Sequence, residues 1–185
     1  MRRAISVFVF SLMISGVPPL NAYEPGTHGE IAQRAAQPSV SSPDRVLREE
    51  LGLPDGVRRT FPGVTRPGPR SVVELVGDGA ESEDVPSRRV LSHFHNPLVD
   101  PWAEAGLNVF LAGGQSSVLW QQDAAQETTT VRLGPFSIQA GGGNRSWQDA
   151  RGHYLDALTR GNEPGRDRTF GEMFETLGHL TLIRK

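Results

Sequence analysis

The sequence predicts a mainly α-helical protein, built as one multi-helix domain with long connecting loops. Its 185 residues suit a single domain. Several segments carry apolar residues at helical spacing and begin with residues that cap helices. Glycine (21) and proline (14) are frequent while hydrophobic residues make up 37%, so we expect long loops and a small core.

The N-terminal segment has the pattern of a signal peptide for export. Two arginines precede an apolar run of 14 residues (AISVFVFSLMISGV), which is shorter than the roughly 20 residues that cross a bilayer. A proline pair follows, and Ala22 offers a small residue for cleavage. We predict a signal peptide over residues 1–22 and an exported domain over residues 23–185, periplasmic or extracellular and without a transmembrane span. A retained N-terminal membrane anchor is the alternative.

Two helices are expected in the first third of the chain. In residues 26–36 (GTHGEIAQRAA), Thr27 can cap the helix and Glu30 lies three positions later, as in a capping box. The second helix is SSPDRVLREELG, in which Ser42 is the cap and a glycine ends the helix. Residues 53–70 are rich in proline and glycine and are expected to form a loop.

The middle of the chain predicts shorter elements. The segment SVVELVGDGAESEDVP begins as a short helix and ends in an acidic turn. AEAGLNVFLAGG and QSSVLWQQDAAQ are expected to be short helices. TTTVRLGPFSI is rich in β-branched residues and predicts a strand or hairpin.

Two amphipathic helices are expected near the C-terminus, each with one apolar stripe. The stripe of SWQDARGHYLDALTR consists of Trp147, Ala150, Tyr154 and Leu158. The stripe of TFGEMFETLGHLTLI consists of Phe170, Met173, Phe174, Leu177 and Thr181. We expect Trp120 and Trp147 in the core, His153 facing solvent, and His179 opposite the stripe of its own helix.

Composition excludes some kinds of site. The chain has no cysteine, so thiolate metal sites and disulfides are excluded, and a metal would need imidazole, carboxylate or backbone ligands. The 19 basic residues nearly balance the 21 acidic ones, which argues against a broad basic surface for duplex nucleic acid.

Three stretches carry residues that can bind metal. Cleavage after Ala22 would give Tyr23 a free α-amino group, and this amine and the Tyr23 carbonyl could chelate a metal beside His28. Alternatively, His28 is a surface or capping residue. In HFHNP, an extended backbone would turn His93 and His95 to one side, and the proline disfavours a helix here. The alternative is a loop in which an imidazole bonds to backbone.

The acidic turn is the third such stretch. Carboxylates complete mixed zinc sites with histidine, although most of this turn could equally be a solvated acidic loop. The acidic residues of the turn are Asp78, Glu81, Glu83 and Asp84.

Five short motifs occur in one order along the chain: THGEIAQRA, GAESED, HFHNP, GQSSVLW and SWQDARGHYLDALT. Together they resemble a bacterial branch of the zinc-dependent phospholipase C and P1-type single-strand nuclease family. The likeness runs from about Tyr23 to Ile183. Each motif alone is weak evidence, but the five in order are fairly specific. The resemblance implies an exported all-α hydrolase with a zinc cluster.

The resemblance also implies a ligand set. Tyr23, through its amine and carbonyl, and His28 would share one zinc. His93 would bind another zinc together with an acidic residue, for which Asp84 is the first choice. Glu81, Glu83 and Asp78 are the other candidates for that acid. His95 occupies a position where the family tolerates other residues, so it is not an expected ligand.

The end of the chain departs from the family. The family continues with LGxxxHLxxDxxxPxH, whereas this chain ends in LGHLTLIRK and places Leu182 where the histidine ligand belongs. We therefore expect an incomplete phospholipase C/P1 nuclease-like fold that holds about one or two zinc ions. The implied activity is hydrolysis of phospholipid or nucleotide phosphate esters by metal-activated water, weak or absent in this chain. The alternative is a non-catalytic exported fragment or binding protein.

Overall fold

The computed structural model describes residues 25–37, 43–83, 92–109, 112–124, 126, 129–133, 136–140 and 145–182. The predicted signal peptide, Tyr23, Ser42 and Asp84 lie outside these residues. The described part is mainly helical, as predicted, with six α-helices. None of its helices is long and apolar enough to span a membrane.

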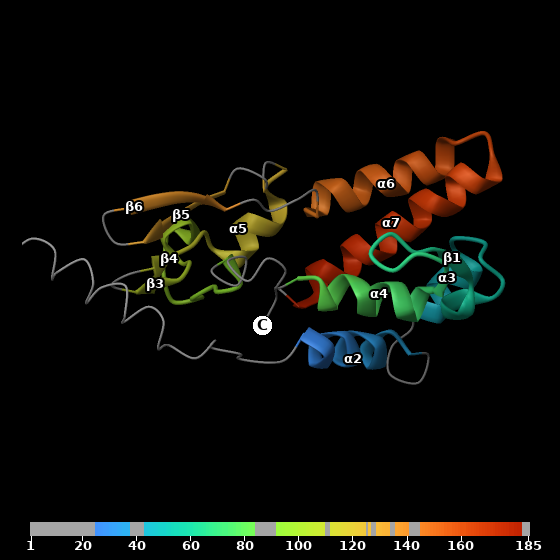
Figure 1. The fold of residues 1–185 in the computed structure, drawn as a ribbon, viewed down its shortest axis with the longest axis horizontal. Helices are drawn as coiled ribbons and strands as arrows, with labels where there is room; N and C mark the ends of the chain where they lie inside the picture. Colours follow the sequence, from blue (N-terminus) through green and yellow to red (C-terminus); the bar gives the residue numbers. More distant parts are fainter. Residues whose placement is uncertain are drawn as a thin grey trace, which may run out of the picture.

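Five helices form a layered helical part of the molecule (Figure 1). Helix α4 packs between α2 and α7, and α6 packs against α7. The short helix α3 lies near the N-terminal end of α4, next to a small hairpin. The bounds of these helices are α2 (Pro25–Ala36), α3 (Pro43–Glu49), α4 (Val72–Glu81), α6 (Trp147–Thr159) and α7 (Glu163–Leu182).

Helix α4 begins and packs for reasons that are visible in its sequence. Ser71 caps it, and the Glu74 carboxylate accepts hydrogen bonds from the Ser71 backbone and hydroxyl, which completes a capping box. Its glycines allow close contact with α7. A Cβ added at Gly79 would lie 1.9 Å from the Glu175 carbonyl oxygen, and one added at Gly178 would lie 2.1 Å from the Val76 carbonyl oxygen.

The segment predicted as a loop between α3 and α4 is more ordered than expected. It contains a 3-10 turn, η1 (Gly56–Arg58), and a hairpin of β1 (Thr60–Pro62) and β2 (Pro69–Ser71). Phe61 explains the hairpin, because its ring is buried and lies 5.3 Å from Phe170 and 5.6 Å from Phe174 between ring centroids. The buried Phe61 ring therefore orders a segment that was expected to be a loop because of its prolines and glycines.

The remaining part of the molecule is a β part, formed by residues 92–140. The helix predicted over residues 103–114 is wrong, since this segment forms η3 (Trp102–Glu104) and two short antiparallel strands. A continuous apolar run does not distinguish a strand from a helix. The predicted short helix α5 and the predicted hairpin are both confirmed. The sheet has the order β3-β4-β5-β6, with bounds β3 (Asn108–Val109), β4 (Ala112–Gly113), β5 (Thr129–Leu133) and β6 (Phe136–Ala140) beside α5 (Ser117–Gln122).

The two amphipathic helices differ in how well their stripes were predicted. On α7, Phe170, Met173 and Phe174 are buried as expected. On α6 the predicted stripe is correct for Ala150, which is buried, and for Tyr154, which packs against the core. It is wrong for Trp147, which is 48% exposed, and for Leu158, which is 57% exposed. Ala157, which lies outside the predicted stripe, is also buried. Small side chains let α6 approach α7 closely, so burial follows the partner helix rather than side-chain size.

Three further residues show the effect of packing. Trp120 is buried at 1% exposure, as expected. His179 is fully buried at 0%, so its expected position away from the apolar stripe did not make it solvent-facing. The reason is that α4 and α6 both pack on α7, which therefore buries more than one face. His153 keeps 27% side-chain exposure and lies 3.4 Å from Glu172 on α7.

Candidate functional site

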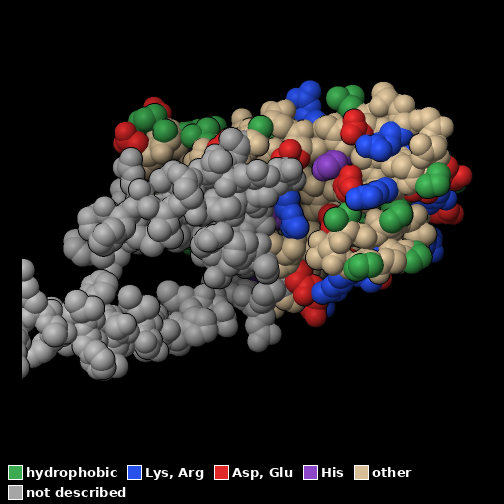
Figure 2. Space-filling model, turned by 45° about the horizontal axis from the view of Figure 1, so that its top comes forward, with side chains coloured by type: hydrophobic (Ala, Val, Ile, Leu, Met, Phe, Trp, Pro, Cys, Tyr) green, Lys and Arg blue, Asp and Glu red, His purple; other side chains and the backbone are tan. Residues whose placement is uncertain are grey.

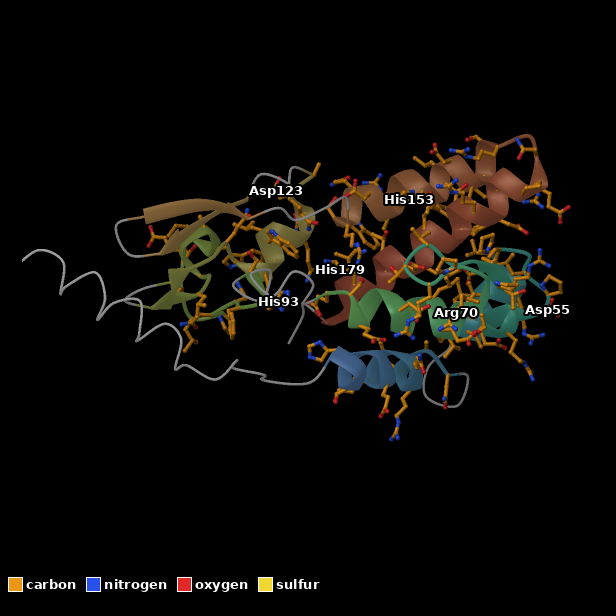
Figure 3. The ribbon with its side chains drawn as sticks, viewed as in Figure 1. Asp55, Arg70, His93, Asp123, His153 and His179 are labelled. Carbon is orange, nitrogen blue, oxygen red and sulfur yellow. The ribbon has the colours of Figure 1, made fainter. Side chains whose placement is uncertain are left out.

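The candidate site lies at the C-terminal end of α4, where the helical part meets the β part. Figure 3 places His93 and His179 at this junction. His93 belongs to the segment that enters the β part, and His179 belongs to the last turns of α7. Two elements far apart in sequence thus bring imidazoles to one end of the helical layers.

His93 pairs with a buried carboxylate of the acidic turn. Its Nε2 atom lies 3.3 Å from Oε1 of Glu83, and the two side chains are 13% and 1% exposed. Burial of a carboxylate is costly unless a partner or a cation compensates its charge. Glu83 therefore contributes the acidic group that the structure brings to His93, whereas Asp84, the first choice from the sequence, lies outside the described residues.

The other two acidic candidates on α4 are held by arginines. Asp78 accepts two hydrogen bonds from Arg70, at 2.9 and 3.0 Å, and lies 3.2 Å from Arg66. This pairing raises the pKa of Arg70 above its usual value. Glu81 pairs with Arg66 as well. These carboxylates tie the β1–β2 hairpin to α4, and basic and acidic side chains intermix over the helical surface visible in Figure 2.

Helix α2 brings His28 toward the same end of α4. The two helices run in opposite directions, because a Cβ added at Gly29 would contact Gly77 and Glu81 while Gln33 lies against Gly77. His28, one residue before Gly29, is half-buried and lies in the turn of α2 beside the C-terminal end of α4. The structure thus places His28 beside the acidic end of that helix.

The Trp120 ring of α5 lies beside both of these imidazoles. Its ring centroid is 6.3 Å from that of His93 and 5.9 Å from that of His179. The indole also packs with Ala150 and Leu180, so it joins the β part to α6 and α7. His179 was expected opposite the apolar stripe of α7, and the packing of α4 and α6 on α7 buries it against the Trp120 ring.

His95 has different surroundings from His93. Its Nδ1 atom lies 2.9 Å from the Ser116 hydroxyl, and its ring packs edge-on against Trp102 at 5.5 Å. It lines an open cavity of about 500 Å³ together with Phe94 and Glu104. The two histidines of HFHNP therefore contact different partners, and His95 is not brought to the Glu83–His93 pair.

A partly buried arginine lies at the C-terminal end of α4. Arg145, just before α6, donates a hydrogen bond to the hydroxyl of Ser82, the residue that precedes Glu83. Burial lowers the pKa of Arg145, and the nearby Glu175 carboxylate partly opposes this effect. The site thus contains a cation as well as a carboxylate and imidazoles.

The spacing of the pair fits two neighbouring zinc ligands. Zinc lies about 2.0–2.2 Å from nitrogen and oxygen ligands, so adjacent ligands of a tetrahedral ion are about 3.4 Å apart. The 3.3 Å separation of His93 Nε2 and Glu83 Oε1 is close to this value. Within the described ranges, no group of three or more histidine, aspartate or glutamate side chains is close enough to hold a metal ion.

Comparison with known proteins gives no relative. No protein-family model, no curated protein and no solved structure matches the chain. The chemistry of this site must therefore be argued from its own geometry. An imidazole nitrogen and a carboxylate oxygen form the beginning of a divalent-cation site, and the neighbouring guanidinium can hold an anion.

Proposed function

We propose that this chain is an exported zinc-binding protein related to phosphate-ester hydrolases, with Glu83 and His93 as its central metal ligands. The observation that carries the proposal is the 3.3 Å approach of a buried carboxylate to an imidazole nitrogen. The five ordered sequence motifs support the same function, because two of them, GAESED and HFHNP, supply these two residues.

Further ligands would come from the N-terminal side. His28 lies in the turn of α2 beside the end of α4, and in the proposed mature chain Tyr23 would add its amine and carbonyl. If Glu83 does not bind the metal, the next residue, Asp84, would supply the acidic ligand. We expect about one or two zinc ions in total, because the described residues bring one carboxylate and one imidazole together.

The proposed substrates are phosphate esters, either phospholipid or nucleotide. Bound zinc would lower the pKa of a coordinated water and polarise a phosphoryl oxygen. The residues of this chain would hold and shape the site. Glu83 and His93 would bind the ion, and the Trp120 ring lies beside the His93 imidazole, with 6.3 Å between the ring centroids. A non-catalytic binding protein is the second candidate. It is favoured because the described residues bring together the pair Glu83 and His93 but no group of three or more possible metal ligands.

Zinc analysis of the exported, processed chain tests the proposal. We expect the wild type to bind about one zinc ion per chain tightly enough to survive gel filtration, and His93→Ala to lose it. His153→Ala is the matched control, because His153 lies on α6 beside Glu172 and away from the pair. A wild-type chain without zinc, or equal zinc in both variants, would contradict the proposal. Zinc binding without hydrolysis of a phosphodiester such as bis(p-nitrophenyl) phosphate would favour the second candidate.

A further inference from the structure

Arg145 differs from the other arginines around α4. Its hydrogen-bond partner within the described ranges is the neutral hydroxyl of Ser82, and no carboxylate of those ranges forms an ion pair with it. Arg66 and Arg70, by contrast, are paired with carboxylates of α4. A guanidinium has five N–H donors, so most of the donors of Arg145 are not used by these residues.

The Glu175 carboxylate does not use these donors either. Glu175 acts on Arg145 through its charge, but both of its oxygens accept hydrogen bonds from the β1–β2 hairpin. The donors to Glu175 are the backbone N–H groups of Val64 and Thr65 and the hydroxyl of Thr65. A partly buried guanidinium whose donors are not used by the described residues is costly in the protein alone and is compensated when an anion binds.

The position of Arg145 connects it with the candidate metal ligands. It docks on Ser82, and the next residue, Glu83, contacts His93. The guanidinium and the His93 imidazole are therefore contacted by two consecutive residues, Ser82 and Glu83, just past the C-terminal end of α4. A tetrahedral oxyanion at this end could accept hydrogen bonds from Arg145 while it lies near the pair.

We infer that Arg145 is the phosphate-binding residue of this site, taking phosphate oxygens through its guanidinium N–H groups. A planar guanidinium matches the spacing of phosphate oxygens and binds them through two parallel hydrogen bonds. The inference rests on the proposed function only in naming the phosphate of an ester as the natural ligand. The anion site itself needs no zinc.

Inorganic phosphate is the probe that tests this inference. The purified chain, stripped of metal with a chelator, is titrated with phosphate at constant ionic strength, and binding is followed by ³¹P NMR line broadening. We expect saturable binding to the wild type and an affinity lower by about tenfold or more in Arg145→Gln, because a charge-assisted hydrogen bond is lost. Arg151→Gln is the matched control, since Arg151 lies exposed on the following helix.

The outcomes separate the two proposals. Equal phosphate affinity in Arg145→Gln and Arg151→Gln, or no saturable binding to the folded wild type, overturns the inference. If circular dichroism shows that Arg145→Gln does not fold, Arg145→Lys decides, with an affinity weaker by about threefold or more expected from the lost second hydrogen bond and an unchanged affinity overturning the inference. Zinc content measured in parallel should be the same in wild type and Arg145→Gln. Absent zinc with intact phosphate binding would remove the proposed function and leave the anion site.

Discussion

The helical part and the β part of this protein are held together in different ways. In the helical part, glycines bring α4 and α7 into backbone contact, and aromatic residues fill the space beside them. In the β part, the buried apolar side chains among those described are Ala105 and Trp120. The helical part is thus a packed frame, whereas the large apolar side chain that the described residues of the β part bury is Trp120, which packs against Ala150 and Leu180 of that frame.

This difference has a consequence for the candidate site. Glu83, Arg145 and His179 are fixed by the helical frame, while His93 comes from the segment that enters the β part. The geometry of the Glu83–His93 pair therefore depends on how Trp120 docks the β part against α6 and α7. Substitutions that loosen this docking should affect the site more than substitutions elsewhere in the β part.

The largest effect is expected from Trp120→Ala. Removing a buried tryptophan should lower the free energy of unfolding by about 3–5 kcal/mol, because it leaves a cavity between the two parts. Trp102→Ala is the matched control, since Trp102 is 52% exposed and its loss should cost less than about 1 kcal/mol. Urea denaturation followed by circular dichroism measures both values. Similar losses in the two variants would show that Trp120 is not the anchor.

A smaller effect is expected within the helical frame from Gly79→Ala. The new Cβ would lie 1.9 Å from the Glu175 carbonyl oxygen, so α4 and α7 must move apart. We expect the free energy of unfolding to fall by about 2 kcal/mol. Gly152→Ala on α6 is the control, because nothing lies within 4 Å of its added Cβ and alanine should raise stability by about 0.5–1 kcal/mol. Thermal unfolding that ranked the two variants in the opposite order would contradict the close packing of the frame.

The smallest effect concerns the cap of α4. Hydrogen bonds from the Ser71 backbone and hydroxyl lower the pKa of Glu74 below 4.5 in the folded protein. The stabilisation that follows is fully present above the pKa of the unfolded chain and is lost as the pH falls through the lower pKa of the folded protein. Ser71→Ala should cost about 1 kcal/mol at neutral pH.

The acid dependence of this cap can be measured directly. Denaturation from pH 6 down to pH 3 should show a shallower loss of stability in Glu74→Gln than in the wild type, because the titrating group is gone. Glu49→Gln, which removes a carboxylate from an exposed pair with Arg45, should leave the slope close to that of the wild type. A wild-type slope in Glu74→Gln would show that the cap does not titrate in this range.

Much of the local structure could be predicted from the sequence. Apolar spacing predicted α6 and α7, the segment SVVELVGDGAESEDVP was expected to begin as the short helix α4, and β-branched residues predicted a strand or hairpin where β5 and β6 lie. The helix assigned to residues 103–114 was wrong, as was the expected burial of Trp147 and Leu158 in the stripe of α6. In both cases a local pattern had more than one packing solution, and neighbouring elements selected among them.

The candidate site shows the same limit. The sequence supplied four acidic residues near HFHNP, but it could not distinguish those that pair with arginine from the one that faces His93. It also gave no reason to expect that Arg145 would bond to the Ser82 hydroxyl and form no ion pair with a carboxylate of the described residues. These partners come from segments far apart in the chain, so local spacing carries no information about them.

The sequence by itself determined the helical class, the place of most helices and the set of residues able to bind a cation, because these depend on side-chain chemistry and on neighbours within a few positions. The predicted cap Thr27 is wrong, since it lies inside α2 (Pro25–Ala36), and the predicted cap Ser42 lies outside the described residues. The tertiary structure decided that Glu83 meets His93, that His179 is buried, and that α6 turns alanines rather than Trp147 inward. Burial and pairing are properties of contacts between distant segments, and such contacts exist only once the layers have packed.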